Sequence, residues 1–138
     1  MLDDSMAEKI DKVAFVYIKD GRMLCTKTRG KDVFYIPGGK RKPGETDPQV
    51  LIREIKEELS VDIVPSSLKW MGIFEAPAHD KPAGTIVKLL CYTGEFKGNL
   101  VPSAEVEEIA WLGFADKGRM SVAGQELFDW LKHWNLLK

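Results

Sequence analysis

Residues 39–61 read GKRKPGETDPQVLIREIKEELSV and carry most of the information in this chain. They open with a charged loop, in which Pro43-Gly44 marks a turn, and continue into a helix. Two N-terminal caps fit that helix. Either Thr46 and Gln49 form a capping box, or Asp47 caps a helix whose first position is a proline. Both caps predict that the helix begins near Asp47.

The predicted helix ends at about Leu59 or Ser60 and has two contrasting faces. Its apolar stripe consists of Leu51, Ile52, Ile55 and Leu59. Roughly opposite, within an arc of about 100°, lie Glu54, Glu57 and Glu58. These like charges repel by roughly a few tenths of a kcal/mol per pair unless a cation intervenes. Mg²⁺ is the natural candidate, because it takes hard oxygen ligands in an octahedron.

Neighbouring residues favour a metal site over a solvated acidic face, which is the other interpretation of such a helix. Arg53, one turn before Glu57, can hold that carboxylate in a fixed orientation, and Glu45 from the loop can pair with Arg53 in turn. The Gly38-Gly39 bend lets backbone carbonyls approach an ion without a side chain in the way. Loop and helix are therefore expected to converge on one point.

Outside this stretch, short apolar runs rich in β-branched and aromatic residues predict strands. The expected strands are residues 12–18, 23–28, 34–36, 68–75, 85–93 and 109–114. A turn at Lys19–Arg22 joins the first two in a hairpin, and a closing helix is expected over Gly124–Leu137. Because no repeat or linker interrupts the chain, residues 1–138 are predicted to form one α/β domain, with residues 1–10 as a flexible N-terminus.

The composition is that of an ordinary soluble domain. Hydrophobic residues make up 44% of the 138 residues and charged residues 30%, which excludes disordered, collagenous and fibrous classes. Twenty basic against 21 acidic side chains give a net charge of -1, so bulk nucleic-acid binding is not expected. No apolar run approaches the roughly 20 residues that span a bilayer, so no membrane association is expected either.

Two further features point to the cytoplasm. The start of the chain is acidic, whereas a signal peptide would be basic and then apolar. Cys25 and Cys91 are isolated in strand-like segments and lack the spacing of a zinc or redox motif. We expect both thiols to be buried, reduced and structural.

The spacing of the charged residues and glycine resembles that of a known motif. Gly39, Glu45 and the run Arg53–Glu58 stand at the positions of the Nudix box, the signature of the Nudix (MutT-like) hydrolases. Chance agreement at six such positions is on the order of 10⁻⁷ to 10⁻⁸ per starting point. Residues Phe34–Gly39 also look like the family's strand entering the loop, so the resemblance covers about a fifth of the chain.

Two positions depart from the family pattern. Phe34 stands where relatives often have Trp, and Ser60 stands where the box usually has Gly just after its helix. The usual Gly suits a left-handed helix exit, which would cost Ser60 about 1–2 kcal/mol. A rearranged exit is therefore the other expectation at Ser60.

The resemblance implies a Nudix-type α/β/α sandwich with a mixed sheet and a divalent cation, Mg²⁺ with Mn²⁺ as a substitute. It also implies hydrolysis of a nucleoside diphosphate derivative by attack of water at phosphorus. By match to the box, the metal ligands would be the Gly39 carbonyl, Glu54, Glu57 and Glu58. Arg53 and Glu45 would be the pair that orients them.

The resemblance leaves the general base open, because relatives draw it from the box or from a later loop. Glu54 is the first candidate. The later candidates are Glu105, Glu107 and Glu108, with exposed loop charge as the alternative. The candidates for phosphate contacts are Lys40, Arg41 and Lys42, for which solvated surface charge is an equally good interpretation.

The part of the sequence that would bind a nucleobase is not marked by a motif. Five aromatic residues could stack on a base, but each fits core or sheet packing better. They are Phe15, Tyr17, Phe74, Tyr92 and Trp111. Pro77, sixteen residues past the box, is loosely similar to a proline of ADP-ribose-cleaving relatives.

The short chain favours a MutT-like enzyme that acts on nucleoside triphosphates, including oxidised ones. ADP-ribose or a nucleotide sugar is the second expectation, followed by dinucleoside polyphosphates and RNA 5′ ends. A different class of function is a Nudix-like sensing module without catalysis, but such modules usually lack box carboxylates, and all are present here. A small nucleotide is the expected partner, and the protein is expected to be a monomer or homodimer.

Overall fold

The first of two main sheets is mixed and holds some of the strands that line the later site. The computed structural model describes residues 9–79 and 81–138, so most of the predicted flexible N-terminus lies outside the described residues. In spatial order the strands are β5 (Gly38–Lys40), β1 (Lys9–Phe15), β8 (Ile86–Thr93) and β7 (Lys69–Pro77). β1 runs parallel to β8, whereas the β1–β5 and β7–β8 pairs are antiparallel.

The second sheet is antiparallel, and it corrects the predicted hairpin. Its strands are β10 (Val106–Leu112), β3 (Arg22–Thr28), β2 (Ile18–Lys19) and β4 (Phe34–Tyr35). The predicted strand 12–18 is split between the sheets: β1 ends at Phe15, and only β2 pairs with β3. Both faces of the chain are buried at this point, with Phe15 in one core and Val16 in the other.

A two-stranded ribbon and two short helical turns complete the connections between the main elements. The ribbon pairs β6 (Asp62–Ile63) with β9 (Phe96–Lys97). The turns are the 3₁₀ helices η2 (Pro65–Ser67) and η3 (Phe114–Arg119).

Helix α1 (Asp47–Leu59) has the predicted bounds, and its start is settled by a capping box. The Thr46 hydroxyl accepts from the Gln49 N–H at 3.4 Å, and the Gln49 side chain accepts from the Thr46 N–H at 2.9 Å. Thr46 is therefore the cap. Ser60 does adopt the left-handed conformation, with φ of 65°, and its hydroxyl donates to the Val101 carbonyl at 3.0 Å.

The predicted apolar stripe of α1 is wrong at one position. Val50 is fully buried, whereas Ile52 is 37% exposed. Helix α2 (Val122–His133) is also shorter than the predicted 124–137. The chain turns at Asn135, whose φ is 58°, so that Leu137 returns to the core while Trp134 stays exposed.

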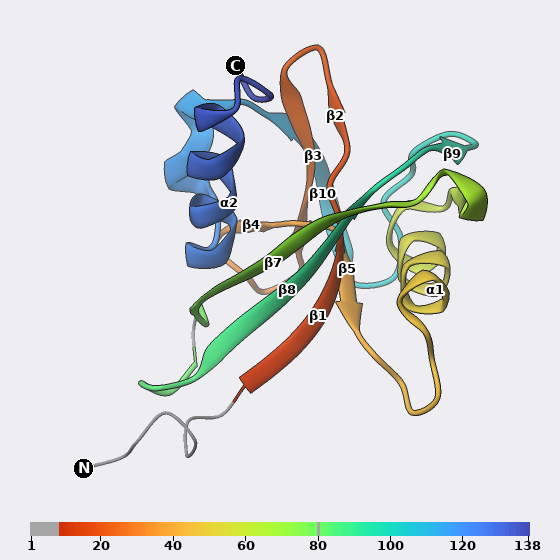
Figure 1. The fold of residues 1–138 in the computed structure, drawn as a ribbon, viewed down its shortest axis with the longest axis horizontal. Coiled ribbons are helices and arrows are strands. Elements are labelled where there is room, and N and C mark those ends of the chain that lie inside the picture. Colours follow the sequence, from red (N-terminus) through yellow and green to blue (C-terminus); the bar gives the residue numbers. More distant parts are fainter. Residues whose placement is uncertain (1–8, 80) are drawn as a thin grey trace.

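The two helices cover opposite sides of the sheets, which makes an α/β/α sandwich (Figure 1). This arrangement confirms the predicted fold class. One buried cluster packs against α1 and the other against α2. Cys25 and Cys91 are buried as free thiols, as predicted. Neither helix in the described part of the chain has the length and apolarity to cross a membrane.

Candidate active site

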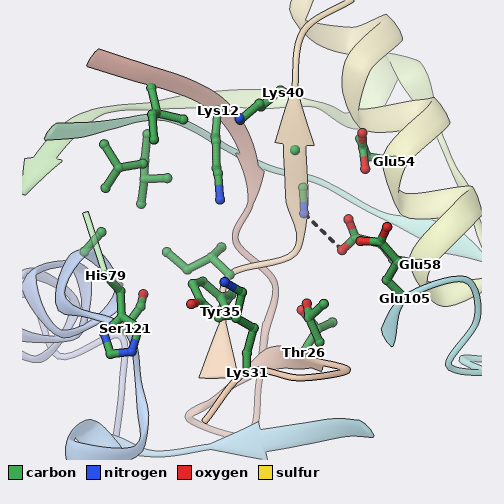
Figure 2. A pocket seen from close by; sticks show the side chains of 18 of the residues that line it. Lys12, Thr26, Lys31, Tyr35, Lys40, Glu54, Glu58, His79, Glu105 and Ser121 are labelled. Carbon is green, nitrogen blue, oxygen red and sulfur yellow. Dashed lines mark hydrogen bonds between the residues drawn. The ribbon is translucent and has the colours of Figure 1, made fainter. Parts of the chain in front are cut away.

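A pocket of about 520 Å³ lies between the two sheets, and its size is typical of a small-molecule site. It reaches from the glutamates of α1 to Ser121 and Ala123 at the beginning of α2 (Figure 2). We call the first end the carboxylate side, formed by Glu54, Glu57 and Glu58. We call the basic lining the lysine side, formed by Lys12, Lys31, Lys40 and Lys81.

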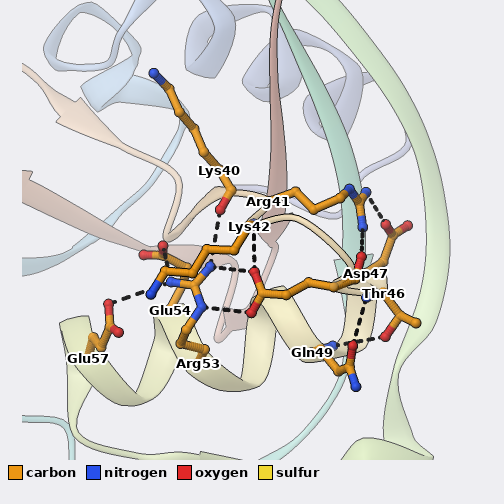
Figure 3. Close-up of polar contacts among 10 residues, drawn as sticks. Lys40, Arg41, Lys42, Thr46, Asp47, Gln49, Arg53, Glu54 and Glu57 are labelled. Carbon is orange, nitrogen blue, oxygen red and sulfur yellow. Dashed lines mark hydrogen bonds and ion pairs between the residues drawn. The ribbon is translucent and has the colours of Figure 1, made fainter.

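Arg53 is the centre of the polar network behind the carboxylate side (Figure 3). Its Nε and Nη2 atoms donate to the two oxygens of Glu45 at 2.8 and 2.7 Å, and Nη2 also donates to the Lys40 carbonyl at 3.1 Å. Glu45 accepts in addition from the Lys42 N–H at 2.8 Å. The Arg53 bonds, followed by the Lys42 bond, lower the pKa of Glu45 to about 2. The predicted pairing of Glu45 with Arg53 is therefore present in the structure.

Arg53 also connects this network to the carboxylates. Its Nη1 donates to Glu54 Oε1 at 2.7 Å but lies 3.8 Å from Glu57 Oε2. The Glu57 side chain is 49% exposed. The sequence spacing predicted that Arg53 holds Glu57. In the structure the shorter contact of Arg53 is with Glu54, the next residue in the chain.

Two glycines allow the loop to approach these carboxylates closely. A Cβ atom at Gly39 would lie 2.5 Å from Glu54 Cδ, so any larger residue at this position would displace the Glu54 carboxylate. Gly38 has a φ of 139°, and its N–H donates to Glu58 Oε1 at 3.4 Å. The bend that sequence analysis assigned to Gly38-Gly39 therefore brings the backbone against Glu54 and Glu58.

The donor set fits a divalent cation. Burial, followed by the charge of nearby Glu54, raises the pKa of Glu58, so two carboxyl groups share a site that favours an added positive charge. Within residues 9–79 and 81–138, no three acidic, histidine or cysteine side chains lie in an arrangement that could hold a metal ion by themselves. Glu54 is instead bonded to Arg53, and Glu57 extends toward solvent. The oxygens of Glu54 and Glu58 and the adjoining Gly39 backbone have the chemistry that Mg²⁺ prefers.

Only one of the three predicted phosphate contacts lines the pocket. Lys40 does so, whereas Arg41 and Lys42 do not. Arg41 forms an ion pair with Asp47 and donates to the Glu45 carbonyl at 2.9 Å. Asp47 also accepts from the Tyr92 hydroxyl at 2.6 Å. The Arg41 side chain thus holds the loop through its bonds to Asp47 and Glu45 (Figure 3), and it does not line the pocket.

Among the later glutamates, Glu105 alone lines the pocket. Glu107 pairs with Lys27 of the neighbouring strand at 3.6 Å, and Glu108 is exposed. Glu105 stands on the same side of the pocket as Glu54 and Glu58 in Figure 2. The structure therefore reduces the three late candidates for the base to one that faces the site.

The aromatic candidates do not line the pocket. Tyr17, for example, packs against Phe15, Phe96 and Trp111. The aromatic ring that does line the pocket is Tyr35, which makes an edge contact with His79 at 6.3 Å between centroids.

Several lining residues were missed by sequence reasoning. They are Lys12, Lys31, Tyr35, His79 and Lys81. His79 contacts Asp32 at 3.0 Å, which joins two loops far apart in the chain. Lys12 directly follows Asp11 and stands at the start of the apolar run 13–18, so no pattern in the sequence marks it as a site residue.

Comparison with known proteins identifies the family of this chain. The model of the NUDIX domain matches residues 10–131. The ADP-ribose pyrophosphatase of Methanocaldococcus jannaschii is 24% identical over 119 residues, which cover 84% of this chain and 69% of that protein.

Solved structures show the same fold. A NUDIX hydrolase from Nitrosomonas europaea has a TM-score of 0.73 at 18% identity, with 94% of this chain and 92% of that chain covered. A MutT NUDIX hydrolase from Burkholderia pseudomallei has a TM-score of 0.65 at 20% identity, with coverage of 78% and 85%. Because the NUDIX model spans nearly the whole described chain, this protein belongs to the Nudix family and is a hydrolase of phosphoanhydride bonds.

Proposed function

We propose that this Nudix hydrolase uses Mg²⁺ to cleave a nucleoside triphosphate, oxidised ones included, into the monophosphate and pyrophosphate. The observation that carries this proposal is the charge pattern of the pocket. Four lysines line it together with four glutamates, the carboxylate side and Glu105. A polyphosphate chain would neutralise the lysines, and a divalent cation would neutralise the glutamates. A longer phosphate chain can contact more of the lysines.

The residues that would hold the cation are Glu54, Glu57, Glu58 and the Gly39 carbonyl. When bound, such an ion neutralises phosphate charge and lowers the pKa of a bound water. Arg53 keeps Glu54 oriented through its 2.7 Å bond, and Glu45 in turn holds Arg53. The attacking water gives its proton to an oxygen of Glu54, for which Glu105 on the same side of the pocket is the substitute.

ADP-ribose is the second candidate substrate. It is supported by the 24% identity to the ADP-ribose pyrophosphatase of Methanocaldococcus jannaschii. Pro77 ends β7 directly before Ala78 and His79, which line the pocket. A sugar could lie against this end of the pocket, where Tyr35 and His79 meet.

A panel of nucleotides tests the proposal. Nucleoside triphosphates, their oxidised forms, ADP-ribose, nucleotide sugars and dinucleoside polyphosphates are incubated with Mg²⁺, with Mn²⁺ or with EDTA. Monophosphate, pyrophosphate and phosphate are then measured. We expect rapid release of pyrophosphate from triphosphates, dependent on the metal. Faster cleavage of ADP-ribose would replace the first substrate by the second, and tight binding without cleavage would favour a sensing module.

The cellular setting is part of the same proposal. We place the enzyme in the cytoplasm, since buried free thiols such as Cys25 and Cys91 are typical of proteins in reducing compartments. A small nucleotide is its proposed partner, and it acts as a monomer or homodimer. Light scattering on the purified chain measures the oligomeric state directly.

A further inference from the structure

Lys12 reaches into the middle of the pocket from β1. Its ammonium group lies 5.6 Å from the centre of the Tyr35 ring, a cation–π contact that directs the charged end inward. Figure 2 shows the side chain extending between Lys40 and Tyr35. The half-buried Lys12 stem lies on the sheet face that also presents Ile10 and Leu89 to the pocket. Lys12 is therefore held in place before any ligand arrives.

The position of Lys12 is electrostatically unfavourable in the protein alone. In the antiparallel register of β1 and β5, Lys12 stands directly opposite Lys40, and like charges in that position repel each other. Neither lysine forms an ion pair with any described residue. Burial, followed by the charge of Lys40, lowers the pKa of Lys12, and the charge of Glu58 opposes this only in part. An anion is the group that would relieve the repulsion.

We propose that Lys12 and Lys40 together bind one phosphate of the substrate, opposite the carboxylate side. This inference rests on the proposed function, since it takes the phosphate chain as the ligand. One phosphate presents several oxygens, so it can accept from both ammonium groups at once. A triphosphate can reach both the lysine pair and the carboxylate side. Lys12 therefore favours substrates with the longer phosphate chain.

The first test measures anion binding without catalysis. The thermal unfolding midpoint is recorded with inorganic tripolyphosphate, in EDTA and at low salt. The variants are Lys12→Met, which keeps the length of the stem, and Lys12→Arg, which keeps the charge. Lys88→Met is the matched control, because Lys88 lies on the neighbouring strand and outside the pocket lining. We expect Lys12→Met to lose at least half of the increase in unfolding midpoint that tripolyphosphate causes in the wild type. Lys12→Arg and Lys88→Met should retain this increase.

The second test separates affinity from turnover. For whichever nucleotide the enzyme cleaves fastest, Lys12→Met should raise KM about tenfold or more, the loss expected of a charge-assisted hydrogen bond. It should change kcat by less than about twofold, because the contact is made equally before and during the reaction. The increase in KM should be larger for a triphosphate than for the matching diphosphate.

The opposite results would overturn the inference. If Lys12 only neutralises Glu58, tripolyphosphate would raise the unfolding midpoint of Lys12→Met as much as that of the wild type. The same variant would then have a lower kcat at constant KM. Failure of the proposed function looks different. In that case the wild-type enzyme leaves triphosphates uncut, while the tripolyphosphate-induced increase in the unfolding midpoint still depends on Lys12.

Discussion

The carboxylate side and the lysine side of the pocket differ in whether their charged groups have ion-pair partners among the described residues. On the carboxylate side, Arg53 lies 2.7 Å from Glu45, 2.7 Å from Glu54 and 3.8 Å from Glu57. On the lysine side, Lys12 faces Lys40, and neither pairs with a described carboxylate. The protein itself orients the carboxylates, whereas we propose that a ligand orients the lysines. Changes on the first side should affect turnover, and changes on the second should affect affinity.

The largest expected effect is on the carboxylate side, at Glu58. Glu58→Gln keeps the size and the acceptor for the Gly38 N–H but removes the carboxylate that we propose as a metal ligand. We expect kcat to fall by about 100-fold or more, the scale on which charge stabilisation at such sites acts. Steady-state kinetics measure the fall in kcat, and thermal unfolding without metal shows whether the fold is intact.

The matched control for Glu58→Gln is Glu126→Gln, which removes an exposed glutamate of α2. It should leave both activity and unfolding unchanged. Near wild-type turnover in Glu58→Gln, with the fold intact, would contradict the role of Glu58 as a ligand.

The next effect is the loss of orientation in Arg53→Ala. This change removes the bonds to Glu45, Glu54 and the Lys40 carbonyl while leaving every carboxylate in place. We expect activity to fall by roughly 10- to 100-fold, as for other groups that orient metal ligands. Arg53→Lys should recover little of it, because an ammonium group cannot form the two parallel bonds to Glu45. Unchanged kcat and metal affinity in Arg53→Ala would show that Arg53 does not orient Glu54.

A smaller effect is expected in acid. Arg53, followed by the Lys42 N–H, holds the pKa of Glu45 at about 2, below its ordinary value of 4.5. Because the folded-state pKa is depressed, Glu45 contributes stability above about pH 4.5 that is lost as the pH falls through about 2. Unfolding midpoints between pH 2 and pH 6 should therefore fall less steeply in Glu45→Gln than in the wild type. Parallel curves for the two proteins would refute this contribution.

The smallest effect is expected at Ser60, where the helix that carries the carboxylate side ends. Ser60→Gly relieves about 1–2 kcal/mol of left-handed strain but loses the bond to the Val101 carbonyl, so stability should change by less than about 1 kcal/mol. Ser60→Ala keeps the strain and loses the bond, so it should be the less stable of the two. Both should retain wild-type kcat. A clear drop in activity would mean that the carboxylates depend on this helix end.

Local patterns predicted α1 well. The capping box and the 3.6-residue period define its bounds, because both depend on residues within one or two turns. The same reasoning failed at Ile52, which fits the stripe by period but lies 37% exposed, since the width of the buried face depends on what packs against it. It failed again at the predicted strand 12–18, whose apolar run 13–18 is shared between two sheets.

The spacing within residues 39–61 determined by itself that Glu54, Glu57 and Glu58 share a helix face and that Arg53 can meet Glu45. These contacts are local or bridge one short loop, so periodicity and charge suffice to predict them. Only the tertiary structure decided that Asp47, the partner of Arg41, also accepts from Tyr92 of β8, and that Lys12 stands opposite Lys40. Those contacts depend on how distant strands pair, and strand register is set by the burial of whole faces, which no single stretch of sequence contains.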